Sequence, residues 1–342
     1  MLSVFHKPVD KLKLAARGKL SFEYLNSIAS PQEKWIYGRR VTEWNVVDRA
    51  RIYTSYDNRY NHESYVDLKP SQFSSWKVVP PLVQKITGAK DLSSLRITEY
   101  HIKVDLIGVT TDQIIREINP LWFRDAFTYK GYNNLKKGKA TRKVIKSKLA
   151  GTEDDPNASE VSILCETLPE SINFGSKKSS QVGVYDAKEK HDEDDNIDDY
   201  DEDNERDDSE DDDNEKPITR IEIRYKGNSV KVKPLNEFIK YLTIRTPFSR
   251  IRFYSYDPGI KINKPQTWMK FDYFCCLVLR FGYRVACQRV RNIDPAHSYR
   301  WDSITRRFQR TDYELDSLFQ KDLKAFINAP ISREDRKVLS LN

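Results

Sequence analysis

The chain has 342 residues, of which 32% are charged, 38% hydrophobic and 12% aromatic, and its formal net charge is +7. This length allows two modest domains or one elaborate domain, and the hydrophobic fraction is sufficient for a real core. No apolar run reaches the ~18 residues of a membrane-spanning helix, so we expect no contact with a membrane.

The charge is distributed unevenly along the chain. Residues 191–215 contain 17 Asp/Glu and one Arg, which leaves the remainder with 57 Lys/Arg against 34 Asp/Glu, a net charge of +23. A folded body this basic predicts a polyanionic partner, and DNA is the partner that we expect. The other interpretation is a generically basic soluble protein.

The first part of the chain predicts an arm followed by a β-rich domain. Residues 1–34 are basic and polar, which indicates a poorly ordered N-terminal arm. Residues 35–149 contain β-type stretches, among them 97–107, and a short helix that Thr111 is expected to cap and Pro120 to end. Residues 130–148 carry eight Lys/Arg and no acid, which predicts a phosphate-contacting segment or a nuclear-import signal, with a solvated loop as the alternative.

Residues 150–216 form a predicted disordered acidic insertion. Low hydrophobicity and dense like charge cannot offset the entropy of ordering the chain, above all over residues 175–216. The simplest interpretation is a solvating linker. The alternative is that the acidic run mimics a polyanion and competes for the basic body, or binds a basic partner.

Residues 217–330 predict the second part of the domain. Their expected elements, in order, are a hairpin over 220–233, a helix over 235–242, a strand over 250–256, a buried strand region over 271–285 and an amphipathic helix over 315–327. Thr311 and Glu314 have the spacing of a capping box at the start of that last helix. Residues 331–342 form a polar tail.

Arginines and aromatic residues alternate between residues 280 and 310, where eight arginines occur with two acids. The arginine fork matches phosphate geometry and aromatic rings stack on bases, so this pattern favours nucleic acid; arginine–aromatic packing on a folded surface is the alternative. The residues predicted to bind DNA are Lys136, Lys137, Lys139, Arg142, Lys143, Arg245, Arg250, Arg252, Arg284, Arg289, Arg291, Arg300, Arg306 and Arg307.

The sequence shows no catalytic motif. None of the five histidines has a metal-binding spacing, and His101, in a predicted strand, is interpreted as a surface or packed residue. The four cysteines form no CxxC, which favours buried free thiols. We therefore expect no enzyme, no metal and no cofactor. The alternative is a replication-initiator endonuclease that uses one of the 19 tyrosines as nucleophile, although the usual pair of histidines is absent.

Several segments, taken in order, resemble the A-box-binding subunit of the RNA polymerase III transcription factor TFIIIC. They are the strand before Pro80-Pro81, the knot INPLWFRDA at 118–126, the block from Leu235 to Tyr256-Asp257-Pro258, and a strand at 271–280. The sequence departs from the family at Gly259, where an arginine commonly follows, and in its central acidic segment.

The resemblance implies a nuclear, non-enzymatic DNA-binding subunit for internal promoters of tRNA genes, with other TFIIIC subunits and TFIIIB as partners. It also implies a winged-helix element. Together with the residue patterns, it predicts an α+β fold with a β-rich, barrel-like antiparallel core, short helices and a long disordered acidic insertion. An RNA-binding or ribosome-associated protein is a further alternative, since basic and aromatic surfaces do not distinguish DNA from RNA.

Overall fold

The computed structural model describes residues 7–16, 20, 22–36, 39–47, 49–55, 64–120, 127–130, 171–175, 180–187, 216–255, 265–293, 301, 304 and 308–340. Within this part of the chain, no helix is long and apolar enough to cross a membrane. The predicted α+β class is confirmed.

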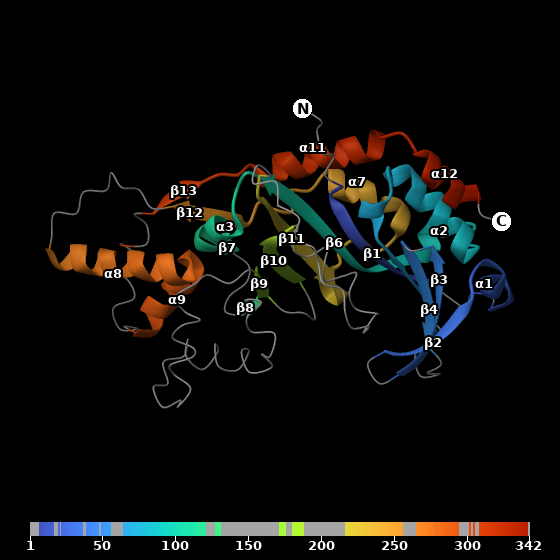
Figure 1. Ribbon diagram of the computed structural model, residues 1–342, viewed down its shortest axis with the longest axis horizontal. Helices are drawn as coiled ribbons and strands as arrows, with labels where there is room; N and C mark the ends of the chain where they lie inside the picture. The colour runs from blue at the N-terminus through green and yellow to red at the C-terminus, as the bar shows by residue number, and fades with distance from the viewer. Residues whose placement is uncertain are drawn as a thin grey trace, which may run out of the picture.

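A ten-stranded sheet forms the body of the molecule (Figure 1), and all of its pairings are antiparallel. Its strands, in spatial order, are β2 (Pro31–Ile36), β3 (Arg39–Val47), β4 (Ala50–Ser55), β5 (Ser64–Leu68), β1 (Val9–Ala16), β6 (Leu95–Ile107), β11 (Ile218–Lys226), β10 (Ser180–Asp186), β9 (Ser171–Gly175) and β8 (Phe127–Lys130). The sheet is open, with β2 and β8 at its edges, so the barrel-like core that the sequence predicted is wrong.

Helices cover one face of this sheet. In Figure 1 they run along its upper side, namely α2 (Val79–Thr87), α7 (Phe238–Thr243), α11 (Leu315–Asn328) and α12 (Arg333–Ser340). The short helix α1 (Phe22–Ile28) packs near β3, where Asn26 accepts a hydrogen bond from the Trp44 indole at 3.0 Å. Apolar side chains of α2, α7 and α11 join those of the strands in the main hydrophobic core.

The two faces of the sheet differ in chemistry because side chains alternate along each strand. On β6 the core face carries Tyr100, Ile102, Val104 and Leu106. The opposite face carries Glu99, His101, Lys103 and Asp105, and we call it the polar face. A bulge at Thr98, between the pairs Lys13–Glu99 and Leu14–Ile97, keeps Ile97 on the core face. Simple alternation along residues 97–107 predicts that Ile97 and Glu99 lie on one face, and the bulge is the reason why this prediction is wrong.

A smaller lobe follows at the other end of the molecule from β2 and β3 (Figure 1). It contains the three-stranded sheet β13 (Gln309–Thr311), β12 (Ile251–Ser255) and β7 (Ile118–Pro120), with α3 (Thr111–Glu117), α8 (Pro265–Phe281) and α9 (Tyr283–Ile293). Gly282 breaks the chain between α8 and α9 at φ +78°, and a Cβ there would lie 2.4 Å from the backbone oxygen of Ile115. Only glycine fits this close approach.

Several predicted elements are confirmed, namely those over 97–107, 111–118, 235–242, 250–256 and 315–327. The cap of the helix at 111–118 is Thr110, whose hydroxyl accepts a hydrogen bond from the Gln113 amide, and not Thr111 as predicted. The last of these helices has no capping box, because Glu314 adopts φ 48° and caps nothing with its side chain. The predicted hairpin over 220–233 is wrong: β11 pairs with β6 and β10, so no return strand has access to its edges.

The predicted strand region over 271–285 is helical. A continuous apolar run does not by itself distinguish a strand from a buried helix. Here Phe271, Phe274 and Val278 are buried while Asp272 and Tyr273 are exposed, which is helical spacing. The thiol of Cys276, on α8, is exposed rather than buried.

Segments that the sequence placed outside the fold form part of it. The predicted N-terminal arm contains β1 at the centre of the sheet, the predicted insertion contains β9 and β10, and the predicted tail contains α12. The three strands are short, and only one face of each is apolar, so their composition resembles that of a disordered segment. The acidic run 191–215 lies outside the described residues.

Asp335 links α12 to the main part of the fold by hydrogen bonds to Ser74 and Arg49. Its buried carboxylate accepts hydrogen bonds from the Ser74 amide at 2.7 Å, from the Ser74 hydroxyl, and from Arg49 Nη1 at 3.0 Å. Burial would raise the pKa of Asp335, but the hydrogen bonds from Ser74 outweigh it and hold the pKa below its ordinary value.

We expect Asp335→Asn to lower the free energy of unfolding by about 1–3 kcal/mol at neutral pH, because a buried network loses its charged acceptor. Since the folded pKa is depressed, the contribution of the carboxylate is complete above about pH 4 and is lost as the pH falls through the folded pKa. Urea denaturation across pH should show the difference between wild type and variant shrinking below about pH 4. A difference that stays constant into strong acid would contradict this.

Candidate metal centre

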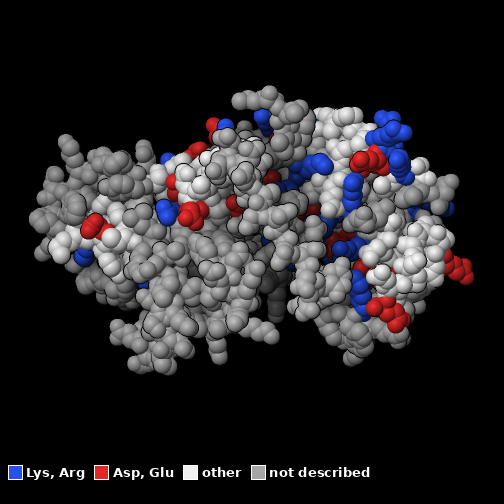
Figure 2. All heavy atoms as spheres, viewed as in Figure 1, with Lys and Arg blue, Asp and Glu red and all other residues white. Residues whose placement is uncertain are grey.

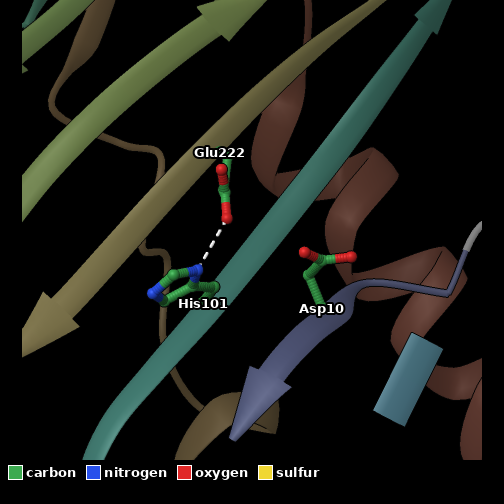
Figure 3. A group of neighbouring side chains, drawn as sticks. All are labelled: Asp10, His101 and Glu222. Atoms are coloured by element: carbon green, nitrogen blue, oxygen red, sulfur yellow. Dashed lines mark hydrogen bonds and ion pairs between the residues drawn. The ribbon is translucent and has the colours of Figure 1, made fainter. Parts of the chain in front are cut away.

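Three side chains on the polar face have the donor atoms of a metal site. Ligand atoms of Asp10, His101 and Glu222 all lie within 4.8 Å of one another. The residues come from three neighbouring strands, β1, β6 and β11 (Figure 3). A register shift between Val9 and Lys11 inserts Asp10 as an extra residue in β1, and this bulge brings its carboxylate to the side of His101.

His101 lies between two carboxylates. Its Nδ1 is 2.8 Å from Glu222 Oε1, and its Nε2 is 2.8 Å from Glu99 Oε1. Burial would lower the pKa of His101, but the hydrogen bonds with Glu222 and Glu99 outweigh burial and raise the pKa above its ordinary value. The imidazolium is therefore favoured when nothing else binds the ring.

Each carboxylate around His101 has a cation of its own. Lys103 Nζ is 3.1 Å from Asp10 Oδ1, Arg224 Nη2 is 2.6 Å from Glu222 Oε2, and Lys226 Nζ is 3.0 Å from Glu99 Oε1. Burial would raise the pKa of Asp10, but the charge of Lys103 lowers it. Burial would also raise the pKa of Glu99, yet hydrogen bonds from His101 and Lys226 hold it at about 2. Asp10 and Glu99 are therefore ionised at neutral pH.

The next strand, β10, places a tyrosine and a glycine beside Glu222. The Tyr185 hydroxyl donates to Glu222 Oε2 at 3.0 Å. Gly183 is the register partner of Glu222, and a Cβ on it would lie 3.0 Å from Asn173 Oδ1, so Asn173 occupies the space that a side chain there would need. That Asn173 oxygen is buried and accepts no hydrogen bond from the described residues. It is an acceptor to which a ligand on this face can donate.

The donor set favours a hard or borderline divalent cation. Two carboxylates and one imidazole suit Mg²⁺, Mn²⁺ or Zn²⁺. Because a histidine ligand must be neutral, such an ion would replace the proton of His101. The surrounding ion pairs could stay in place, since each carboxylate offers a second oxygen.

The residues predicted to bind DNA do not form this site. Those in 136–143, together with Arg300, Arg306 and Arg307, lie outside the described residues. Arg252 donates to the backbone oxygen of Ser249, Arg284 Nη1 donates to Asn119 at 3.1 Å, and Arg289 lies 4.0 Å from the ring centroid of Phe281. These three have structural contacts within the smaller lobe.

The remaining described members of the predicted set lie in or near the same lobe. Arg245 lies over the ring of Tyr241 at 5.0 Å, while Arg250 and Arg291 are exposed. In the face drawn in Figure 2, the described Lys and Arg atoms gather instead over the half where Figure 1 places β1 to β4, α2 and α12.

Sequence reasoning missed the cluster because its members are far apart in the chain. Only the sheet brings positions 10, 101 and 222 together. His101 was interpreted as a surface or packed residue; it is buried and bonded on both ring nitrogens. The available signal was the pattern of charged residues alternating with apolar ones in β6 and β11, which indicates one polar face but not which of its residues meet.

No family model and no curated protein matches the chain. A solved structure of a rolling circle replication initiator protein from Geobacillus stearothermophilus is similar with a TM-score of 0.36 and 14% identity, over 74% of this chain and 88% of that chain. A TM-score at this level does not establish a shared fold.

The functional expectation of a TFIIIC subunit is corrected. The structural neighbour is a replication initiator, the class of the alternative interpretation, and no TFIIIC subunit was matched. The structure also removes part of the basis for the resemblance, because the segment compared with a family strand, 271–280, lies in helix α8.

We expect excess Mn²⁺ to raise the Tm of the wild-type chain, because an ion that binds only the folded state stabilises it by about 2.7 kcal/mol at 100 times its Kd. Asp10→Asn or Glu222→Gln should remove most of this shift. The matched control is Asp67→Asn, which removes a carboxylate of β5 that pairs with Lys11 at 3.2 Å outside the cluster. It should keep the full shift.

The Mn²⁺ shift should also depend on pH. The raised pKa of His101 means that the proton competes with the ion at low pH, so the shift should be larger at about pH 8 than at about pH 6. Without metal the sign is opposite: the His101 proton stabilises the fold below about pH 6.5, and that contribution is lost as the pH rises through the folded pKa. Equal Mn²⁺ shifts in wild type and Asp10→Asn would contradict the assignment.

Proposed function

We propose that this chain is a metal-dependent enzyme that cleaves phosphodiester bonds of nucleic acid, in the manner of a replication initiator. The observation that carries the proposal is the Asp10–His101–Glu222 cluster on the polar face, with the Tyr185 hydroxyl 3.0 Å from Glu222. The strong basic charge outside the acidic run supports a polyanionic substrate.

The roles of the residues follow from their positions. Asp10, His101 and Glu222 would hold one divalent ion, which would polarise a phosphoryl oxygen and neutralise charge that develops during displacement. Lys103 and Arg224 remain close to the carboxylates and can also attract phosphate.

The charge balance also supports a phosphate substrate. The carboxylates of Asp10, Glu99 and Glu222 are paired one to one with cations, so exchanging the His101 proton for a divalent ion adds one positive charge. A phosphodiester carries one negative charge and would restore the balance. A neutral substrate would leave the extra charge uncompensated in a largely buried setting, which is costly.

Tyr185 is positioned to act as the nucleophile. Its hydroxyl donates to Glu222, which can accept the phenolic proton as the oxygen bonds to phosphorus. The bond from phosphorus to one sugar oxygen then breaks, and that oxygen takes the proton that Glu222 had accepted from the tyrosine. The product is a covalent link between the tyrosine and the nucleic acid, which conserves the energy needed for rejoining.

We expect the full-length chain with Mn²⁺ or Mg²⁺ to cleave a labelled single-stranded DNA oligonucleotide and to form a covalent adduct on a denaturing gel. EDTA should abolish the reaction, and His101→Ala or Asp10→Asn should slow it about 100-fold or more. Tyr185→Phe should lose the adduct but keep the Mn²⁺ shift in Tm. The control is Tyr313→Phe, since the Tyr313 hydroxyl donates to Glu117 at 2.6 Å, away from the cluster.

The outcomes separate the parts of the proposal. If Tyr185→Phe still forms the adduct, the nucleophile is another tyrosine, and the assignment of the metal centre is unaffected. A wild-type chain that binds Mn²⁺ but cleaves neither DNA nor an RNA oligonucleotide of the same sequence would overturn the proposed function, and the cluster would then be a structural ion site.

A further inference from the structure

Two tyrosines and a lysine lie on the polar face, along β1 from the metal centre. Tyr53 on β4 and Tyr65 on β5 are register partners, and their rings are stacked with centroids 5.5 Å apart and an interplanar angle of 23°. Lys13 Nζ on β1 is 4.8 Å from the Tyr53 centroid and 5.4 Å from the Tyr65 centroid. We call this group the tyrosine platform.

The platform faces away from the hydrophobic core. The residues adjacent to its members along the strands, Ile52, Val66 and Leu14, are fully buried on the core face, whereas Lys13, Tyr53 and Tyr65 are half-buried. Ala15 is the register partner of Tyr65 on β1, so the neighbour of the Tyr65 ring on that side is a small side chain. Tyrosines whose only task is to fill the core would lie on the other face.

The platform has cations for a phosphate backbone. Arg51, two residues before Tyr53, is exposed and forms no ion pair with a described residue. Lys13 lies over both rings, at a distance typical of a cation–π contact, and its flexible side chain can move away from them. A base that stacks there would displace the ammonium toward a phosphate, for which lysine is a suitable partner.

The distance to the metal centre matches a few nucleotides. Asp10 and Lys13 are three residues apart on β1, which is about 10 Å of strand. Tyr65 and Tyr53 lie one and two strands to the side of β1, which adds about 5 and 10 Å across the sheet. A strand held at the platform would therefore span a few nucleotides before it reaches the Asp10–His101–Glu222 cluster.

We infer that the tyrosine platform binds the bases of single-stranded nucleic acid and positions the strand for cleavage at the metal centre, an inference that in its second half rests on the proposed function. Single strands are the fitting class because a duplex keeps the faces of its bases stacked on one another. Aromatic side chains stack on bases of any sequence, so the platform selects strandedness and not sequence.

The test measures binding separately from cleavage, by fluorescence anisotropy in EDTA with a labelled oligo(dT) of about 20 nucleotides. The Tyr53→Leu/Tyr65→Leu double variant should bind at least about 10-fold more weakly than wild type. Tyr53→Phe/Tyr65→Phe, which keeps the rings, should bind like wild type and so controls for folding. A matching oligo(U) decides whether the site also accepts RNA, and a duplex should be affected less than twofold by the leucine changes.

Salt titration adds a measurement that does not depend on the tyrosines. Arg51→Ala should reduce the slope of log K against log salt by about 0.7 if it contacts one phosphate of a single strand. Wild-type affinity in the double leucine variant, or an equal loss for duplex and single strand, would overturn the inference. If binding depends on the platform but the chain never cleaves, only the proposed function is contradicted. If the chain cleaves but binding does not depend on the platform, only the role of the platform is contradicted.

Discussion

Paired charges on one face of a ten-stranded sheet are the constraint on which the structure of the site depends. A buried carboxylate without a partner costs several kcal/mol, so each acid on this face needs a cation within reach. Asp105 has its cation on the neighbouring strand in register, Arg220 at 2.7 Å, and Asp10 has Lys103 on the adjacent strand, whereas Glu222 is paired with Arg224 two residues along its own strand. The sheet can present charged side chains at its centre only because β1, β6 and β11 supply both signs together.

His101 differs from the other charged groups on this face because its charge can be exchanged. Lysine and arginine cannot give up their protons at neutral pH within ion pairs, whereas an imidazole between two carboxylates can lose its proton to a metal ion. The same two carboxylates that raise the pKa of His101 would also attract the ion that replaces the proton. A proton site and a metal site are therefore two states of one arrangement, and the ion concentration and the pH decide between them.

Local patterns predicted the elements in which apolar side chains recur at regular helical or strand spacing. An example is the apolar stripe of Leu235, Phe238 and Leu242 in η6 (Leu235–Glu237) and α7. They failed where two structures share a pattern, as in the apolar run of α8, and where a bulge changes the face of a strand, as at Thr98. The candidate site could not be predicted from spacing, because its ligands are separated by 91 and 121 residues in the chain and meet only through strand order. That order is set by packing between distant strands, which no local window contains.

The first strand shows why this matters for function. Its sequence VDKLKLAA is short and basic, which in isolation indicates a disordered arm, yet it lies between β5 and β6 at the centre of the sheet. Leu12 and Leu14 supply the core, while Asp10 reaches the metal centre and Lys13 the tyrosine platform. A shift of β1 by one residue would turn its core side chains to the polar face and its polar side chains to the core. The strand that joins the sheet into one body is therefore also the one that fixes the spacing between the candidate metal centre and the platform.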